Sequence, residues 1–490
     1  MKTNSLDFDA QALREKILDL AMRGKLVKQD PNDEPASVLL EKIKAEKAEL
    51  IKEKKIKKSK PLPEITDDEK PFDIPDSWEW VRLGEIGSII SGGTPKKSEK
   101  SYWDKANIPW ITPASMAATQ NEIVYKNDDL KFINKNGLEH SSAHLISANS
   151  IVVSSRAPIG YVNIVPFDYT TNQGCKSIVP YTYIENKYIY FVIKFTTPDM
   201  YKRASGTTFK EISGTRFGET VIPLPPLSEQ SRIAAKIAQL FALLRKVESS
   251  NQQYAKLQTL LKSKVLDLAM GGKLVKQDPN DEPASVLLEK IKAEKAELVK
   301  EKMIKKSKPL PEITDDEKPF AIPDSWEWVR LGEILKPESH KKPDIDFTYI
   351  DIASVDNQIN KVTAPTKIVI GKDKVASRAR QILSKNDILF SVVRPYLKNI
   401  AIVPDTTQLL IGSTGFYVLK PFSLINRQYI FYLVLSNYVI QNMTKKMKGD
   451  NSPSIRKGDL QNFIIPLPPL SEQNRIVADI RKLFALLSKV

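Results

Sequence analysis

Basic, amide and hydroxyl side chains gather in the polar loops of two segments of the chain, 87–221 and 335–464. Lys and Arg pair with phosphates, whereas forked, amide and hydroxyl side chains can read base edges in a groove. This combination predicts contact with a nucleic acid. The candidates in the first segment are Lys96, Lys97, Arg156, Asn172, Gln173, Thr207, Thr208 and Lys210, and those in the second are Arg378, Arg380, Arg394, Lys398, Ser413, Thr414, Asn451, Ser452, Arg456 and Lys457.

The placement of these candidates supports the prediction in two ways. Lys96 and Lys97 follow the pair Gly92-Gly93, and glycine lets a backbone approach a phosphate closely. The two segments also share a skeleton of short motifs, although most of their residues differ. For any single candidate, a role in shaping its own loop remains an equal alternative. The aligned motifs begin at Arg156 and Arg394, and at Asn172 and Ser413.

The motifs of a nucleic-acid-modifying enzyme are missing from the sequence. A DNA amino-methyltransferase needs a Gly-rich cofactor turn and an Asn/Asp-Pro-Pro-aromatic loop, and the nearest match, Asn107-Ile-Pro-Trp110, lacks the first proline. No G-x-x-x-x-G-K-[ST] loop is present to hold phosphates. His140 and His144 are four residues apart without a Cys or carboxylate at suitable spacing, and His340 stands alone. We therefore expect no catalytic residue, no metal site and no cofactor bound by this chain.

Composition and charge narrow the class of protein. The chain has 490 residues, of which 41% are hydrophobic, enough for two or three globular domains. Its formal net charge of +15 favours a polyanionic partner, most simply a nucleic acid. The single cysteine, Cys175, fits a reducing compartment, and neither a signal peptide nor a membrane span is visible. We expect a cytoplasmic protein with no membrane contact.

A long repeat frames the two variable segments. Residues 16–86 recur almost unchanged at 264–334. An invariant frame around two different segments predicts that the frame binds two copies of one partner while the segments bind different ligands. Gene conversion that keeps the repeats alike is the alternative. The repeats differ at Ile17/Val265, Arg23/Gly271, Ile51/Val299, Lys55/Met303 and Asp73/Ala321.

Residues 228–272 predict one helix of unusual length. Apolar residues recur at helical spacing without a glycine or proline until Gly271-Gly272, and Ser228 is expected as the N-cap, with Glu229 in the first turn. About 40 residues reach roughly 60 Å, so this helix should pack along another. Such a partner is available from the two ends of the chain, which together rebuild most of a second copy and predict a pseudo-twofold axis. The matching ranges are 465–490 with 222–247, and 16–24 with 264–272.

Helix and strand signals divide the rest of the chain. Asp9 and Gly24 are expected to cap and stop a first helix, and a second should run from Pro35 to about Lys58, ending in the basic run 54–60. The β-branched runs 150–154, 388–393 and 399–403 predict strands, and 188–201 and 429–443 predict helices, so each variable segment should be one α/β domain. The expected boundaries are 1–74 for the N-terminal helices and linker, 75–227 for the first variable domain, 228–322 for the central helix and repeated arm, 323–470 for the second variable domain and 471–490 for the C-terminal helix.

Three motifs resemble the specificity subunits of type I restriction–modification systems, over essentially the whole chain. They are SGGTPKKSEKSYWDKANIPW at 91–110, TNQGCKSIVP at 171–180, and both copies of PLPPLSEQ. The resemblance implies two target-recognition domains of the α/β (α+β) class, separated by long, paired, antiparallel helices of the coiled-coil kind. Because the chain ends at Val490, the second helix is expected to be less complete than the central one.

The resemblance also implies a function. Each target-recognition domain would read one half of a bipartite, asymmetric site on double-stranded DNA. The helices would dock two methyltransferase subunits and, through them, the restriction subunits, and these partners would use S-adenosylmethionine, ATP and Mg. The chain itself would be non-catalytic. Two alternatives remain open, a free-standing two-headed DNA-binding regulator and a structural adaptor without DNA contact.

Overall fold

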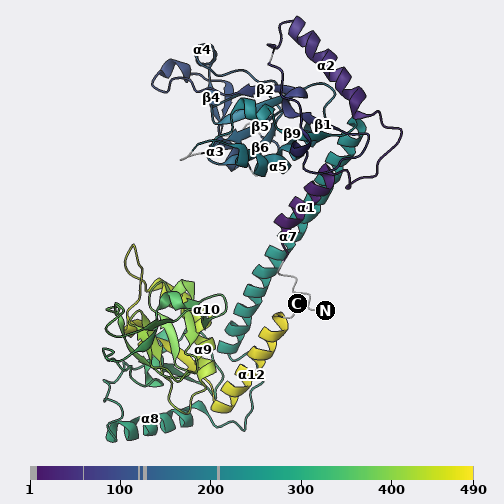
Figure 1. Ribbon diagram of the computed structural model, residues 1–490. Coiled ribbons are helices and arrows are strands. Elements are labelled where there is room, and N and C mark those ends of the chain that lie inside the picture. The colour runs from purple at the N-terminus through teal and green to yellow at the C-terminus, as the bar shows by residue number, and fades with distance from the viewer. Residues whose placement is uncertain (1–7, 59, 120–121, 125–129, 207–209, 489–490) are drawn as a thin grey trace. The chain divides into compact units, whose positions relative to one another are not determined.

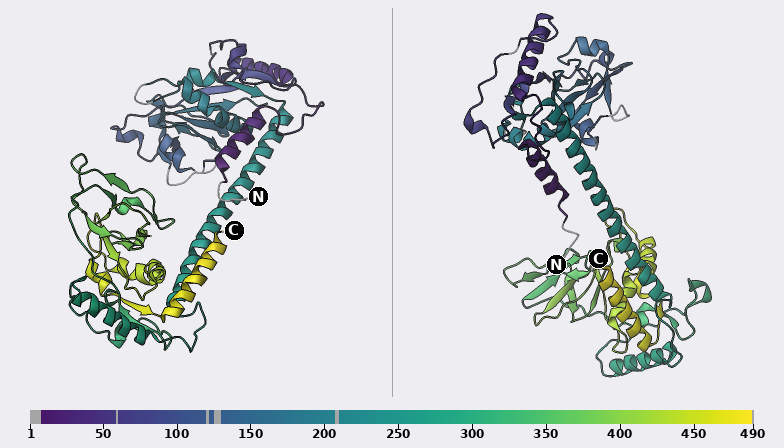
Figure 2. Two further views of the ribbon diagram at one scale, coloured as in Figure 1. Left: turned by 60° about the horizontal axis from the view of Figure 1, so that its bottom comes forward. Right: turned by 90° about the vertical axis from the view of Figure 1, so that its right-hand side faces the viewer.

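The computed structural model describes residues 8–58, 60–119, 122–124, 130–206 and 210–488. The chain forms two compact units, Met1–Asn251 and Gln252–Val490, hereafter the first and second unit. Their boundary falls inside helix α7 (Leu227–Met270), so one continuous helix contributes to both. Each unit combines a mixed α/β domain with a pair of helices and a helical arm (Figures 1 and 2).

The α/β domain of the first unit contains two small sheets. One has the strand order β2-β8-β5-β6 and the other β4-β3-β7. Strand β7 runs parallel to β3 and leads through the turn 172–174 into β8, so this turn links the two sheets. The strands are β2 (Gly87–Ser91), β3 (Ile108–Ile111), β4 (Lys131–Ile133), β5 (Ser150–Ser155), β6 (Ile159–Val165), β7 (Thr170–Thr171) and β8 (Cys175–Pro180).

The second unit repeats this plan with additions at the edges. Its sheets have the orders β14-β11-β18-β15 and β12-β13-β17-β16-β19. Strand β18 runs parallel to β11 and leads through the turn 414–415 into β19, as β7 leads into β8. The strands are β11 (Phe347–Ile350), β12 (Val355–Asp356), β13 (Lys361–Val362), β14 (Thr366–Ile368), β15 (Ala379–Leu383), β16 (Ile388–Ser391), β17 (Ile400–Ile402), β18 (Leu410–Ser413) and β19 (Phe416–Leu419).

Helices cover the sheets and complete the cores. Helix α5 (Asn186–Arg203) packs on β5 and β6, with Tyr188 and Phe191 fully buried. In the second unit the equivalent stretch is broken into α9 (Arg427–Leu435) and α10 (Asn437–Lys445), because Ser436 leaves the helical conformation and caps α10. The predicted strands and the helix expected at 188–201 are thus confirmed, whereas the single helix expected at 429–443 is wrong, since two helices stand there. Short helices are α3 (Pro113–Ala118), α4 (Lys135–Glu139), α6 (Gly214–Gly218) and α11 (Lys457–Gln461).

The repeated frame adds the same structure to each unit. A two-stranded ladder joins its ends: β1 (Glu79–Arg82) pairs with β9 (Val221–Leu224), and β10 (Glu327–Arg330) pairs with β20 (Ile464–Leu467). The guanidinium of Arg82 is buried and donates to backbone oxygens of the linker and to Glu69, which fixes the linker against the ladder. In the second unit, Arg330 donates in the same way to backbone oxygens of the linker and to Glu317.

Antiparallel helix pairs run along α7 within each unit. In the first unit, α1 (Ala10–Met22) starts beside Glu248, which binds Arg14, and the following loop reaches the start of α7, where Gln29 binds Glu229. In the second unit, α12 (Leu470–Leu487) ends at Gln258, whose amide donates to the Leu487 carbonyl at 2.7 Å. The predicted antiparallel pairing is therefore present within each unit.

Two predicted helix ends need correction. Helix α7 begins at Leu227, one residue before the expected cap Ser228, whose hydroxyl instead donates to the Asp33 carboxylate. Helix α2 (Ala36–Lys52) and its copy α8 (Ala284–Lys300) end well before Lys58, because Lys54 and its counterpart Lys302 adopt positive φ angles. The basic run 54–60 therefore lies beyond the helix. The caps expected at Asp9 and Gly24 are confirmed.

Candidate nucleic-acid interface

The PLPPLSEQ motif fixes each α/β domain on its helices. Glu229 is buried, and its carboxylate accepts hydrogen bonds from Trp78 Nε1 at 2.9 Å and Gln29 Nε2 at 2.6 Å. Burial raises the pKa of Glu229, and these two hydrogen bonds partly oppose that shift. Gln230 accepts from the backbone N–H of Glu185 at the start of α5. The motif therefore orients the helix that supports the sheet.

The second unit repeats this arrangement almost atom for atom. Glu472 accepts from Trp326 at 2.9 Å and from Gln277 at 2.6 Å, and burial raises its pKa as well. Gln473 accepts from the backbone N–H of Asn426 at 2.9 Å, at the start of α9. Both α/β domains are thus held on the frame by the same buried contacts.

Four loops of the first unit converge at one end of the β2-β8-β5-β6 sheet. The Gly93 N–H donates to the Thr171 carbonyl, and the Ser155 N–H to the Gly174 carbonyl, each within 2.9 Å. The Ile212 N–H donates to the Ser155 carbonyl at 3.0 Å. The described candidates Lys96, Lys97, Arg156, Asn172, Gln173 and Lys210 all lie in or beside these loops.

The second unit gathers its candidates in the same place. The Val392 N–H donates to the Gly415 carbonyl at 3.0 Å, and the Ile455 N–H to the Val392 carbonyl at 2.9 Å. The Thr414 N–H donates to the Arg378 carbonyl at 2.9 Å, which brings the start of β15 to this end. The candidates so collected are Arg378, Arg380, Arg394, Lys398, Ser413, Thr414, Asn451, Ser452, Arg456 and Lys457.

The structural equivalence corrects one of the two sequence alignments. Asn172 and Ser413 do correspond, since the side-chain oxygen of each accepts from the turn glycine, Gly174 at 3.0 Å and Gly415 at 3.2 Å. Arg394 does not correspond to Arg156. Val393, not Arg394, forms the isolated β-bridge that Arg156 forms in the first unit. Arg394 corresponds to Ala157, since each directly precedes a proline and adopts a positive φ, 47° and 48° respectively.

The structure gives a different reason for the pair Gly92-Gly93 from the close approach of a phosphate that we expected. A Cβ on Gly92 would lie 1.9 Å from the Asn172 carbonyl oxygen, and one on Gly93 would lie 2.2 Å from the backbone of Ser142. Only glycine fits because the protein's own backbone passes there, so the pair shapes the loop end. The adjacent Lys96 and Lys97 side chains are exposed.

Burial separates the candidates into two groups. Several have internal roles: Ser413 is buried, Asn172 caps its turn, and the Lys398 ammonium donates to the Leu435 carbonyl at 3.4 Å. Burial lowers the pKa of Lys398, and the nearby Asp267 carboxylate partly opposes that shift. The exposed candidates are Lys96, Lys97, Gln173, Lys210, Arg378, Arg380, Arg394, Asn451, Ser452 and Arg456. Thr207 and Thr208 lie outside the described residues.

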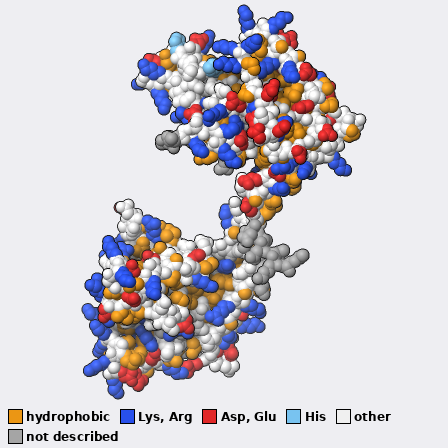
Figure 3. Space-filling model, in the orientation of Figure 1, with side chains coloured by type: hydrophobic (Ala, Val, Ile, Leu, Met, Phe, Trp, Pro, Cys, Tyr) orange, Lys and Arg blue, Asp and Glu red, His pale blue; other side chains and the backbone are white. Residues whose placement is uncertain are grey.

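Carboxylates that the sequence did not single out hold cations at each loop end. Glu211 lies 3.5 Å from both Arg156 and the buried Lys176. In the second unit, Glu338 binds Lys457 at 2.6 Å. These ion pairs join residues far apart in the chain, so no local sequence pattern predicts them. They leave the exposed cations as the candidates for phosphate contact, and Lys and Arg side chains are spread over the visible face of each unit in Figure 3.

Three further observations concern an aromatic pair, metal ligands and membrane spans. The Trp103 ring packs edge-on against the Trp110 ring with centroids 5.4 Å apart. Among the described residues, no group of His, Cys, Asp and Glu side chains could hold a metal ion. The helices that the structure describes include none long and apolar enough to cross a membrane.

Comparison with known proteins places this arrangement in a family. Residues 75–258 and 323–489 match the family described as type I restriction modification DNA specificity domain. The specificity subunit of the Escherichia coli type I restriction enzyme EcoAI is 34% identical over 99% of this chain and 90% of its own length. The MjaIX specificity subunit of Methanocaldococcus jannaschii is 26% identical over 81% of this chain and 84% of its own length.

A solved structure shows the same fold. A chain from a study of complex assembly and conformational transition in a type I R-M system superimposes with a TM-score of 0.56. The match covers 85% of this chain and 92% of that chain at 21% sequence identity. At this identity the likeness concerns the fold.

Proposed function

We propose that this chain, which belongs to the type I restriction–modification DNA specificity family, reads a bipartite and asymmetric site on double-stranded DNA, one half with each unit. The first half-site would be read by loops at the end of the β2-β8-β5-β6 sheet. The second would be read by the loops around the turn 414–415. Because the two loop sets differ in sequence, the two half-sites should differ as well.

One observation carries the proposal: a shared frame holds two different loop sets at the same end of two similar domains. The buried contacts of Glu229 and Glu472 are alike, as are the caps made by Asn172 and Ser413. The side chains that project from the loops are not alike. Selection for two separate readings on one scaffold accounts for both facts.

The exposed cations supply the DNA contacts in this proposal. Lys and Arg bind phosphates and set the register of a protein on the duplex, while guanidinium and amide groups read bases. We assign phosphate contact to Lys96, Lys97, Lys210, Arg378, Arg380, Arg394 and Arg456. We assign base contact to Gln173, Thr414, Asn451 and Ser452; Thr207 and Thr208, proposed from the sequence alone, are outside the described residues. Arg156, Asn172, Lys398, Ser413 and Lys457 shape the loops.

The partners follow from the same proposal. Two methyltransferase subunits dock on the repeated helices and arms, and restriction subunits join through them, in the cytoplasm. S-adenosylmethionine, ATP and Mg serve those subunits. The boundaries 1–74, 75–227, 228–322, 323–470 and 471–490 then divide the chain into docking and reading parts.

A methylome comparison tests the proposal. Methylated bases are mapped genome-wide with the gene present and deleted, and in the deletion strain complemented by the wild-type chain. Loss of one split motif on deletion, with return on complementation, supports a bipartite reader. An unchanged methylome contradicts it and favours a regulator or an adaptor.

A further inference from the structure

Two of the five differences between the long repeats fall at one place in the fold. Arg23 of the first repeat is Gly271 in the second, and Asp73 is Ala321. Of the other three differences, Ile17/Val265 and Ile51/Val299 keep an apolar side chain, and Lys55/Met303 lies elsewhere in the sequence. A paired loss of one basic and one acidic side chain, in an otherwise repeated sequence, points to a change in what this surface contacts.

In the first unit the arginine occupies an aromatic surface of its own chain. The Arg23 guanidinium carbon lies 4.4 Å from the centroid of the Phe72 ring, and its Nε donates to Asp19 at 2.7 Å. Phe72 packs in turn on Trp80, with centroids 5.1 Å apart. Burial by itself would raise the pKa of Asp19, but hydrogen bonds from Arg23 and Lys16 hold it below its ordinary value.

In the second unit the same surface lacks its arginine. Phe320 and Trp328 pack with centroids 5.0 Å apart, as their counterparts do, and Phe320 also meets the Tyr438 ring where Phe72 meets Phe195. Residue 271 is glycine, so Asp267 has no arginine four residues on, and its carboxylate accepts from Asn437 instead.

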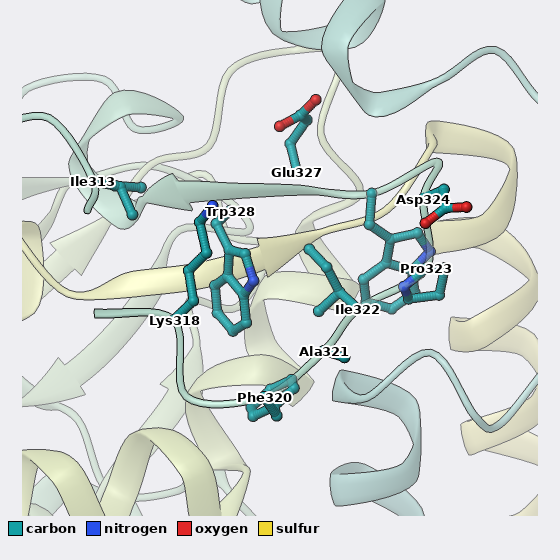
Figure 4. A pocket seen from close by; sticks show the side chains of 10 residues that line it. Ile313, Lys318, Phe320, Ala321, Ile322, Pro323, Asp324, Glu327 and Trp328 are labelled. Atoms are coloured by element: carbon teal, nitrogen blue, oxygen red, sulfur yellow. The ribbon is translucent and has the colours of Figure 1, made fainter. Parts of the chain in front are cut away.

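A pocket of about 500 Å³ lies at this surface. Phe320, Trp326 and Trp328 line it together with Ala321 and Asp324. In Figure 4, Phe320 and Trp328 lie on the same side of the β10 ribbon, and the small Ala321 side chain stands between Phe320 and Ile322. Lys318, which also lines the pocket, is engaged, since its Nζ lies 2.6 Å from the Asp315 carboxylate.

We propose that this pocket is a guanidinium socket, which takes an arginine side chain from a protein partner docked on the second unit. The arginine would lie over Phe320 and pair with Asp267, as Arg23 lies over Phe72 and pairs with Asp19. The evidence for the socket is the pair of differences between the repeats and the pocket at Phe320. That the donor is a methyltransferase subunit rests on the proposed function.

The chemistry favours arginine over other occupants. A flat, weakly hydrated guanidinium stacks on an aromatic face and can still donate to a carboxylate, whereas an ammonium group is a strongly hydrated point charge. A purely apolar occupant would leave Asp267 without the guanidinium hydrogen bond that its counterpart Asp19 holds, since the cation near Asp267 is the inward-turned Lys398 ammonium. In the first unit Arg23 already occupies the corresponding position over Phe72.

The test uses full-length variants in which residues of one repeat are replaced by their counterparts from the other repeat. The probe is N-acetyl-arginine amide, followed by the ring-current shift of its δ-methylene protons, with N-acetyl-citrulline amide as the uncharged control. Wild type should show one saturable site. Gly271→Arg with Ala321→Asp should show none, and Arg23→Gly with Asp73→Ala should show two. Each exchange installs residues that the other repeat already tolerates, so folding is preserved.

The outcomes separate the socket from its donor. The arginine probe should bind at least about tenfold more tightly than the citrulline probe, and equal binding overturns the socket. Absence of probe binding to wild type overturns it too. With purified methyltransferase subunit, Gly271→Arg with Ala321→Asp should weaken assembly at least about tenfold. Probe binding with unchanged assembly overturns the assignment of the donor, while DNA specificity and the proposed function stand.

Discussion

Two neighbouring cations, Arg394 and Lys398, differ in ways that binding measurements can detect. Both precede β17 and both adopt positive φ angles. The Arg394 side chain is exposed, with Nη2 donating to the Asn451 carbonyl at 2.8 Å. The Lys398 ammonium is turned inward to the Leu435 carbonyl. Of the two, Arg394 is the one that we propose contacts a phosphate.

Replacement of each by alanine removes one positive charge, so the two variants are matched in net charge. A phosphate contact contributes about 0.9 to the slope of log K against log salt on duplex DNA. Arg394→Ala should therefore lower the slope by about 0.9, so that the loss of affinity from about 50 to about 200 mM salt is about 3.5-fold smaller than in wild type. Lys398→Ala should leave the slope unchanged.

Fluorescence anisotropy with a labelled duplex that contains the mapped target measures both slopes on the assembled complex. Circular dichroism melting of each variant checks that the fold is retained. Equal slope changes for the two variants would refute the reasoning, because net charge alone would then govern binding. An unchanged slope for Arg394→Ala would remove that residue from the interface.

Three further predictions concern the frame. Glu229→Ala leaves the buried Trp78 indole N–H without its acceptor and should lower the free energy of unfolding by about 1–3 kcal/mol, as should Glu472→Ala in the second unit; denaturant titration measures both, and no loss would refute the buried contact. Because burial raises the pKa of Glu229, the folded chain keeps this proton to higher pH than the unfolded chain does, so stability should fall as pH rises from the ordinary Glu pKa through the raised one. Glu229→Gln should flatten this pH dependence in melts recorded at several pH values. An unchanged slope would show that the carboxyl titrates normally. Four residues inserted near Leu257 lengthen α7 by roughly 6 Å and should lengthen the spacer between half-sites by about one or two base pairs in the methylome, whereas an active variant with the original spacer would show that the helix does not set the distance.

Periodicity and repetition made most of the fold predictable. The spacing of apolar residues located α7, and near-identity of the repeats located both helical arms, since these signals are local or need only the chain compared with itself. The β-branched runs located β5 and β16 for the same reason. Helix ends were less accessible, because the start of α7 depends on how Ser228 meets Asp33, a residue nearly two hundred positions away.

The structure brings the described loop candidates together, whereas the surroundings of each one depend on contacts that the sequence does not display. Their convergence at one sheet end follows from the shared skeleton, which the sequence displays. Whether a cation faces solvent depends on tertiary partners: Lys398 turns to a helix carbonyl and Lys457 to Glu338, and neither partner is visible in sequence. The one-residue error that equated Arg156 with Arg394 arose because both precede or form an X-Pro step, and only backbone pairing distinguishes them.

Exchange of the second variable segment, 335–464, for that of a family member with a different target tests the central claim most directly. The methylome of a strain that carries the exchanged chain is compared with that of the wild type. If each unit reads its own half-site, one half of the split motif changes while the other half remains as it was. A change in both halves, or in neither, would contradict independent reading by two units on one frame.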